Sequence, residues 1–142
     1  MSITNITIRA YIAAERHKVW EYYTHPEHIT KWNFAAPSWH CPAASNDLRS
    51  GGKYTARMEA RDGSFGFDFE AIYDKVIEGE QFSYTILDGR KVSVYFKTKG
   101  DNTEVMITFE AEEENSPELQ RTGWQAILNN FKYYTETQNT IK

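Results

Sequence analysis

The chain contains 142 residues, with 16 Lys and Arg against 20 Asp and Glu, and its formal net charge is −4. This length is enough for one domain with its own core, residues 1–142, and the lone Cys41 excludes an internal disulfide. The acidic balance argues against a nucleic-acid partner, because proteins that bind nucleic acids present basic patches to the phosphate backbone.

Neither a membrane span nor a secretory signal is visible in the sequence. No uninterrupted apolar run reaches the length of a bilayer-spanning helix. Residues 1–10 lack the basic and apolar segments of a signal peptide. We therefore expect a soluble, cytoplasmic protein without a membrane partner.

The start of the chain predicts one strand and two short helices. Apolar and polar residues alternate over residues 2–11, which is typical of a half-buried strand. The period then changes to helical spacing over residues 13–23, and Pro26 is suited to begin a second helix. The expected buried positions of these helices are Val19, Trp20, Tyr23, Ile29 and Trp32.

Residues 33–50 show no clean period and contain Pro37 and Pro42. We interpret this segment as a long irregular loop, and loops of this length inside a compact domain are usually functional or mobile. Because aromatic side chains lie in it or at its edge, among them Trp32 and Trp39, we expect it to pack as a lid or plug at one end of the domain.

Five further strands are predicted between residues 54 and 109, where apolar and polar side chains alternate in five runs. Asp62-Gly63 and Asp88-Gly89 are typical hairpin-turn pairs, so the strands form an antiparallel meander. One sheet face is expected to carry Tyr54, Met58, Phe65, Phe67, Phe69, Phe82, Tyr84, Val94, Phe96, Ile107 and Phe109. A register slip of one residue around Ile72 and Tyr73 would exchange inner and outer side chains there.

A long helix is predicted from Ser116, the expected N-cap, and Pro117, the first helical position, to about Thr137. Its apolar stripe is Leu119, Trp124, Ile127, Leu128, Phe131 and Tyr134. The fold class is therefore α+β, with this helix laid across a strongly curved antiparallel sheet. The aromatic sheet face either fills the interior or leaves a cavity, and the pattern is compatible with both.

Several short segments, taken together in order, resemble a known family. They are residues 14–20, 22–29, 31–32, 47–54, 58–63 and 123–128. The set is similar to the stand-alone members of the family named for the C-terminal domain of the Hsp90 ATPase activator, within the START-like, or Bet v 1-like, helix-grip superfamily. The resemblance implies a curved six-stranded antiparallel sheet around the C-terminal helix, two short helices after the first strand, and an elongated cavity between sheet and helix.

Residues with reactive side chains form no recognisable catalytic or metal-binding motif. The four histidines, at positions 17, 25, 28 and 40, lack zinc-ligand spacing, and adjacent residues such as His40 and Cys41 seldom point toward each other. Asp68 and Glu70 share a strand face that we expect to point to solvent, and the two glycines at 51–52 precede a strand rather than a phosphate-binding helix. We therefore expect no catalytic residues, no metal and no cofactor.

Superfamily relatives include lipid and hormone carriers, polyketide cyclases and proteins that sequester reactive natural products. The leading hypothesis is a non-enzymatic binder of a small hydrophobic or aromatic molecule. Arg49 is the favoured polar anchor, ahead of Arg57. The expected cavity lining is Trp32, Trp39, Arg49, Tyr54, Phe67, Phe69, Tyr84, Phe96, Trp124, Leu128 and Phe131.

Two alternatives stay open. One is an enzyme of the cyclase, dehydratase or hydrolase kind, in which Arg49, Tyr54 or Tyr84 would polarise a substrate oxygen. The other is a stress-related or chaperone-interacting protein. In the eukaryotic activator a separate N-terminal domain contacts the chaperone, and because this chain shows no counterpart we expect a small ligand rather than a chaperone as its partner. A homodimer is compatible with a domain of this size.

Overall fold

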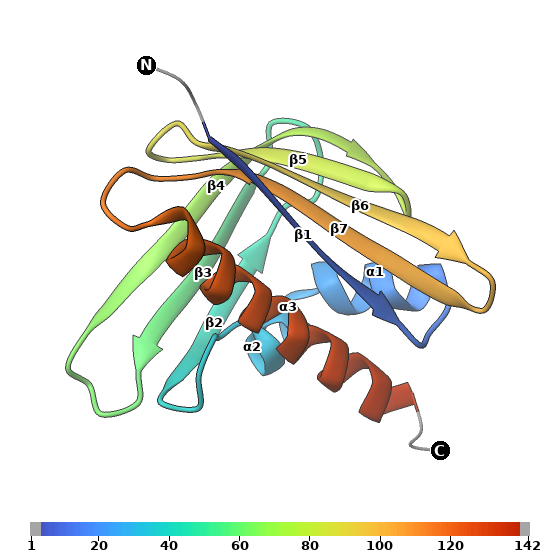
Figure 1. The fold of residues 1–142 in the computed structure, drawn as a ribbon, viewed down its shortest axis with the longest axis horizontal. Helices are drawn as coiled ribbons and strands as arrows, with labels where there is room; N and C mark the ends of the chain where they lie inside the picture. Colours follow the sequence, from blue (N-terminus) through green and yellow to red (C-terminus); the bar gives the residue numbers. More distant parts are fainter. Residues whose placement is uncertain (1–3, 140–142) are drawn as a thin grey trace.

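A curled antiparallel sheet forms the body of the protein, and the C-terminal helix lies along its concave side (Figure 1). The computed structural model describes residues 4–139. The strands are β1 (Asn5–Ile12), β2 (Trp39–Asn46), β3 (Lys53–Ala60), β4 (Gly66–Ile77), β5 (Gln81–Ile86), β6 (Lys91–Lys99) and β7 (Asn102–Glu110). The helices are α1 (Arg16–Thr24), α2 (Pro26–Trp32) and α3 (Pro117–Asn139).

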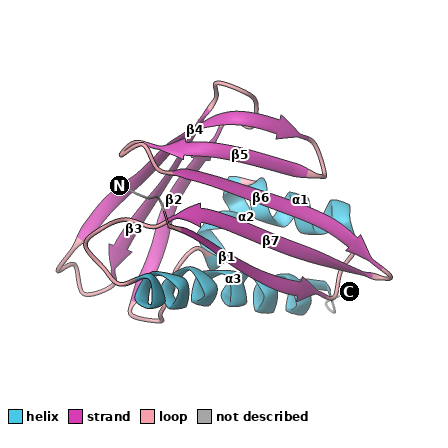
Figure 2. Ribbon diagram, turned by 45° about the horizontal axis from the view of Figure 1, so that its top comes forward, coloured by secondary structure: helices cyan, strands magenta, loops and turns pink. Residues whose placement is uncertain are grey.

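The seven strands are ordered β1-β7-β6-β5-β4-β3-β2, and each neighbouring pair is antiparallel. Strands β2 to β7 follow one another as a meander, and β1 joins at the β7 edge (Figure 2). Apolar residues alternate with polar ones along the strands, as in β6, where Val92, Val94 and Phe96 are buried and their neighbours are more exposed. The α+β helix-grip prediction is confirmed.

The helix ends follow from local capping chemistry. The Glu15 carboxylate accepts the backbone N–H groups of His17 and Lys18 at the start of α1. Pro26 occupies the first turn of α2, and the Ser116 hydroxyl oxygen accepts the Leu119 N–H at the start of α3, as the sequence predicted.

The prediction of an irregular loop over residues 33–50 is wrong, because this segment contains strand β2. The strand pairs with β3 at the sheet edge, and its register shifts between His40 and Ala43. Pro42, which cannot donate to a ladder, lies at this irregularity. The proline and the bulge break the alternation that would reveal a strand. The sheet therefore has seven strands rather than six, and the segment extends it and packs against α2 instead of forming a lid.

A register shift in β4 lies where the sequence indicated. Pairing with β5 is irregular between Tyr73 and Lys75. Before the shift Ile72 points outward and is 39% exposed, whereas Tyr73 is buried; after it, Val76 is the next side chain that packs against the core.

Six aromatic side chains fill the space between α1, α2, the second half of α3 and the middle of the sheet. This aromatic cluster consists of Trp20, Tyr23, Trp32, Phe82, Phe96 and Phe131. The Tyr23 ring lies at its centre, with its centroid 4.8 Å from that of Trp32 and 5.0 Å from that of Phe131. The rings meet at tilted or edge-to-face angles, which are favourable for aromatic pairs.

Helix α3 is attached to the free edge of β1 by side-chain hydrogen bonds. These run from Arg121 Nη1 to the Thr7 carbonyl oxygen (2.7 Å), from Gln125 Nε2 to that of Arg9 (3.2 Å) and from Lys132 Nζ to that of Tyr11 (2.6 Å). The bonds occupy carbonyl groups that an edge strand would otherwise leave unpaired. They fix α3 on the β1 side of the concave face.

Replacement of Phe131 by alanine should lower the free energy of unfolding by about 3–5 kcal/mol, because the ring is fully buried in the aromatic cluster. Tyr133→Ala, two residues further along α3, should change it by less than about 0.5 kcal/mol, since Tyr133 is 70% exposed. Urea denaturation measures both values. Equal losses would contradict this placement of the core.

Candidate functional site

A cavity of about 280 Å³ lies between the first half of α3 and the concave face of the sheet. Its aromatic lining is Tyr23, Trp32, Tyr54, Phe67, Phe69, Tyr73, Phe82, Tyr84 and Trp124. The aliphatic lining is Ile29, Met58, Ile107, Ile127 and Leu128, and the polar lining is Asn33, Asn46, Arg90, Glu112 and Gln120. A mostly apolar surface with a few polar groups is typical of small-molecule pockets.

Most of the residues expected to line a cavity do so. They are Trp32, Tyr54, Phe67, Phe69, Tyr84, Trp124 and Leu128. The rings from β3, β4 and β5 contact one another, as shown by the 5.9 Å separation of the Tyr54 and Phe69 centroids. On the opposite wall, Trp124 stacks on Phe109 of β7 with a centroid separation of 4.0 Å.

Four of the expected lining residues lie elsewhere. Phe96 and Phe131 belong to the aromatic cluster and are fully packed. Trp39 packs against Phe65 and Phe67 toward the β2 edge, with centroids 6.0 and 6.2 Å away. Arg49 is exposed and pairs with Asp47, two residues earlier, at 2.9 Å.

The polar residue at the hairpin end of the cavity is Arg90, which sequence reasoning missed in favour of Arg49. Arg90 alternates with Val92, Val94 and Phe96, so strand periodicity already placed it on the inner face. Its position directly after the Asp88-Gly89 turn concealed this signal. Asn33 and Asn46 were missed because they lie in the segment interpreted as a loop.

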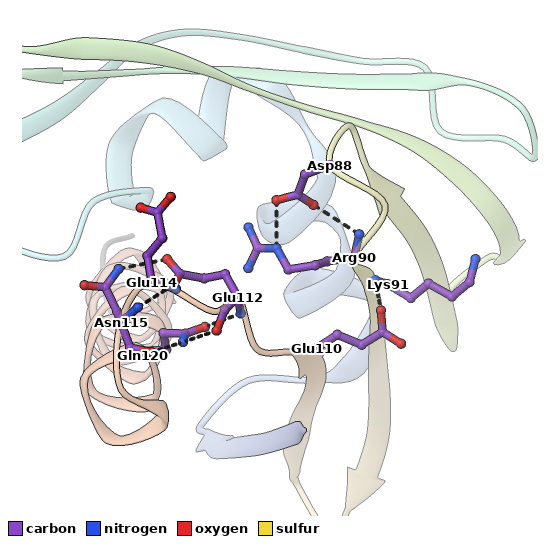
Figure 3. Close-up of polar contacts among 8 residues, drawn as sticks. All are labelled: Asp88, Arg90, Lys91, Glu110, Glu112, Glu114, Asn115 and Gln120. Atoms are coloured by element: carbon purple, nitrogen blue, oxygen red, sulfur yellow. Dashed lines mark hydrogen bonds and ion pairs between the residues drawn. The ribbon is translucent and has the colours of Figure 1, made fainter. Parts of the chain in front are cut away.

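Arg90 lies beside the connection between β7 and α3, as Figure 3 shows. Its Nε donates to Asp88 Oδ2 at 2.9 Å, and its backbone N–H donates to Asp88 Oδ1 at 3.1 Å. Across the opening, the Glu112 carboxylate accepts the backbone N–H groups of Glu114 and Asn115 and the Asn115 side-chain amide. These bonds lower the pKa of Glu112 and make it a weak base.

Gln120 ties the same connection to α3. Its Nε2 donates to the carbonyl oxygens of Glu112 and Asn115, and its Oε1 accepts the Glu112 N–H at 2.9 Å. The loop beside the cavity is therefore held by a closed set of hydrogen bonds (Figure 3).

Four tyrosines bring hydroxyl groups to the cavity. Burial raises the pKa of Tyr54 and Tyr84 well above the usual range, and burial also raises the pKa of Tyr23 and Tyr73. Tyr73 donates to Asn46 Oδ1 at 2.7 Å. At neutral pH all four side chains keep their protons and are hydrogen-bond donors.

His40 and Cys41 do not form a nucleophile and base. The His40 ring faces Glu59 at 3.6 Å, whereas the buried Cys41 thiol donates to the Ala43 carbonyl oxygen. Burial raises the pKa of Cys41, which opposes formation of the reactive thiolate.

The remaining candidates have structural environments. Asp68 pairs with Arg57, and Glu70 pairs with Lys53, on the outer side of β3 and β4. Position 52 requires a glycine, because a Cβ atom there would overlap the Asp47 carbonyl oxygen. Within residues 4–139, no three His, Cys, Asp or Glu side chains converge as a metal site would require.

In the part of the chain that the structure describes, none of the helices combines the length and apolar character needed to cross a lipid bilayer.

The model of one protein family, described as activator of Hsp90 ATPase homolog 1-like protein, matches residues 13–136. The chain belongs to this family. None of the curated proteins matches the chain.

Solved structures agree with the family assignment. The solution structure of the AHSA1-like protein from Aeromonas hydrophila is 39% identical, with a TM-score of 0.91 over 96% of this chain and 94% of that chain. A solution structure from Cytophaga hutchinsonii is 48% identical, with a TM-score of 0.82 over 97% and 96%. A crystal structure from Chromobacterium violaceum is 20% identical, with a TM-score of 0.83 over 93% and 96%, and shows likeness of fold alone.

The Tyr84 hydroxyl should make stability fall at high pH. Its pKa in the folded protein lies above the value of 10.0 expected for a free side chain, so above about pH 10 the unfolded chain loses a proton that the folded protein keeps. This contribution is complete below pH 10 and declines as the pH rises. Tyr84→Phe should reduce that decline by about 1.4 kcal/mol per pH unit in urea denaturation. Tyr95→Phe, on the convex face, is the matched control, and equal effects of both changes would contradict the assignment.

Proposed function

We propose that this protein binds a small hydrophobic or aromatic molecule in the cavity between α3 and strands β3 to β5. The observation that supports the proposal is the unfilled space of about 280 Å³, which three rings of the aromatic cluster, Tyr23, Trp32 and Phe82, border on one side. The volume of the cavity is close to the lower end of the range of ligand-pocket volumes, which suits a ligand of one to three rings. Rings and aliphatic side chains dominate its lining, so transfer of an apolar molecule from water is favourable.

An enzyme of the cyclase or dehydratase kind would use the same cavity, with Tyr84 and Arg90 polarising a substrate oxygen. Such a reaction also needs a base. Glu112 is the one carboxylate that lines the cavity within residues 4–139, and its oxygens already accept three N–H groups from the loop. This arrangement favours binding over catalysis.

The neutral dye N-phenylnaphthylamine tests the proposal, because its fluorescence rises when it leaves water. The protein should bind it saturably at one site. Ile127→Trp places a larger side chain in the cavity and should weaken binding by about tenfold or more, since the lost space removes most ring contacts.

Ile72→Trp provides the control, because Ile72 lies on the convex face of β4 and is 39% exposed. It should bind the dye as the unchanged protein does, and thermal unfolding should show both variants folded. Absence of saturable binding, or equal binding by the Ile127 variant, would refute the proposal.

A further inference from the structure

Strand register places Arg90 and Tyr84 at the same end of the cavity. Tyr84 pairs with Val92 across β5 and β6, and Arg90 precedes Val92 by two residues on the same face. The two side chains are therefore diagonal neighbours, a separation that long side chains bridge. In the hairpin that joins β5 to β6, the Ile86 N–H donates to the Arg90 carbonyl oxygen at 2.8 Å, which holds Arg90 beside the end of β5.

The Arg90 guanidinium is only partly used by the protein. Its side chain is 23% exposed, and its Nε is bonded to Asp88. Its two terminal nitrogens form no hydrogen bond within residues 4–139 (Figure 3), and the guanidinium charge also acts on the Glu112 carboxylate, whose pKa it helps to lower. A half-buried guanidinium whose terminal nitrogens are not hydrogen-bonded is suited to bidentate binding of a carboxylate.

The Tyr84 hydroxyl is also without a partner. The residue is 7% exposed and lines the cavity, and within the described part of the chain its oxygen neither donates nor accepts a hydrogen bond. Among residues 4–139, the one side-chain oxygen that is both fully enclosed and without a hydrogen-bond partner is Thr135 Oγ1. The Tyr84 oxygen, which also has no partner among these residues, is therefore not fully enclosed by protein atoms. The Tyr84 hydroxyl therefore opens on the cavity, and burial keeps it protonated by raising its pKa.

The acidic groups nearby are already occupied. Both oxygens of Asp88 accept bonds from Arg90, and both oxygens of Glu112 accept bonds from the loop. Within residues 4–139, the groups at this end of the cavity that form no hydrogen bond are the Arg90 terminal nitrogens and the Tyr84 hydroxyl, and both can donate. An acceptor on the ligand could pair with both, whereas a cationic group would lie beside the Arg90 charge.

We propose that the ligand is an aromatic carboxylate, with its rings against Phe69 and Trp124 and its carboxylate held by the Arg90 fork and the Tyr84 hydroxyl. This inference rests on the proposed function and adds the chemical class of the ligand. The apolar walls exclude strongly hydrated anions such as inorganic phosphate, and the two donor groups select for an anionic end on the bound molecule.

Cinnamate and its neutral amide, cinnamamide, are matched probes of nearly the same shape. Displacement of N-phenylnaphthylamine measures the affinity of each. The protein should prefer cinnamate by about tenfold or more, the strength of hydrogen bonds between charged groups. Arg90→Met should abolish the preference, and because methionine keeps the apolar stem, any change in affinity that remains should be the same for cinnamate and cinnamamide.

Two further variants separate a local contact from a general charge effect. Arg57→Met removes an arginine that pairs with Glu59 and Asp68 outside the cavity, and it should leave the preference intact. Tyr84→Phe removes one oxygen and should reduce cinnamate affinity by about three- to tenfold with little effect on the amide. This small change keeps the inference testable if the Arg90 variant does not fold.

The outcomes distinguish the two proposals. If the dye binds but cinnamate and cinnamamide compete equally, the carboxylate assignment is wrong and the cavity assignment stands. Retention of the preference in Arg90→Met, or its loss in Arg57→Met, would also overturn the carboxylate assignment. If neither the dye nor cinnamate binds the unchanged protein, both proposals fail.

Discussion

The attachment of α3 to the free edge of β1 determines the shape of the interior. Arg121, Gln125 and Lys132 donate to successive outward carbonyl groups of β1, which fixes the helix on one side of the concave face. A curled sheet of seven strands is wider than one helix, so α3 cannot also cover β3, β4 and β5. Whether side chains fill the interior beside β3, β4 and β5 therefore depends on α1 and α2.

The interior consequently has a filled half and an open half. Helices α1 and α2 bring Trp20, Tyr23 and Trp32 against the second half of α3, and the aromatic cluster closes that region. Within residues 4–139, no helix occupies the same position beside the first half of α3, where Gln120, Trp124, Ile127 and Leu128 face the sheet across the cavity. The filled half holds the buried aromatic rings, whereas the open half contains the cavity that we propose as the ligand site.

Much of this fold could be predicted from the sequence because local rules determine it. Alternation, turn pairs and caps located β1, the β3–β7 meander and all three helices. Strand β2 was missed because Pro42 and a bulge interrupt its pattern at a sheet edge. The site was harder, because Phe96 and Tyr84 have similar sequence surroundings. Phe96 is covered by Trp20 of α1, whereas Tyr84 lines the cavity. This difference depends on packing between segments far apart in the sequence. Arg49 was preferred to Arg90 because Arg90 directly follows the Asp88-Gly89 turn, which concealed its inward alternation with Val92.

The central claim is that the open half of the interior holds the ligand, and intermolecular nuclear Overhauser effects test it most directly. With N-phenylnaphthylamine bound, dye protons should show contacts to the methyl groups of Ile127 and Leu128, which line the cavity. The methyl groups of Val19 and Val105, in the filled half, should show none. Contacts to Val19 and Val105 with none to Ile127 and Leu128, or contacts confined to surface side chains, would contradict the account.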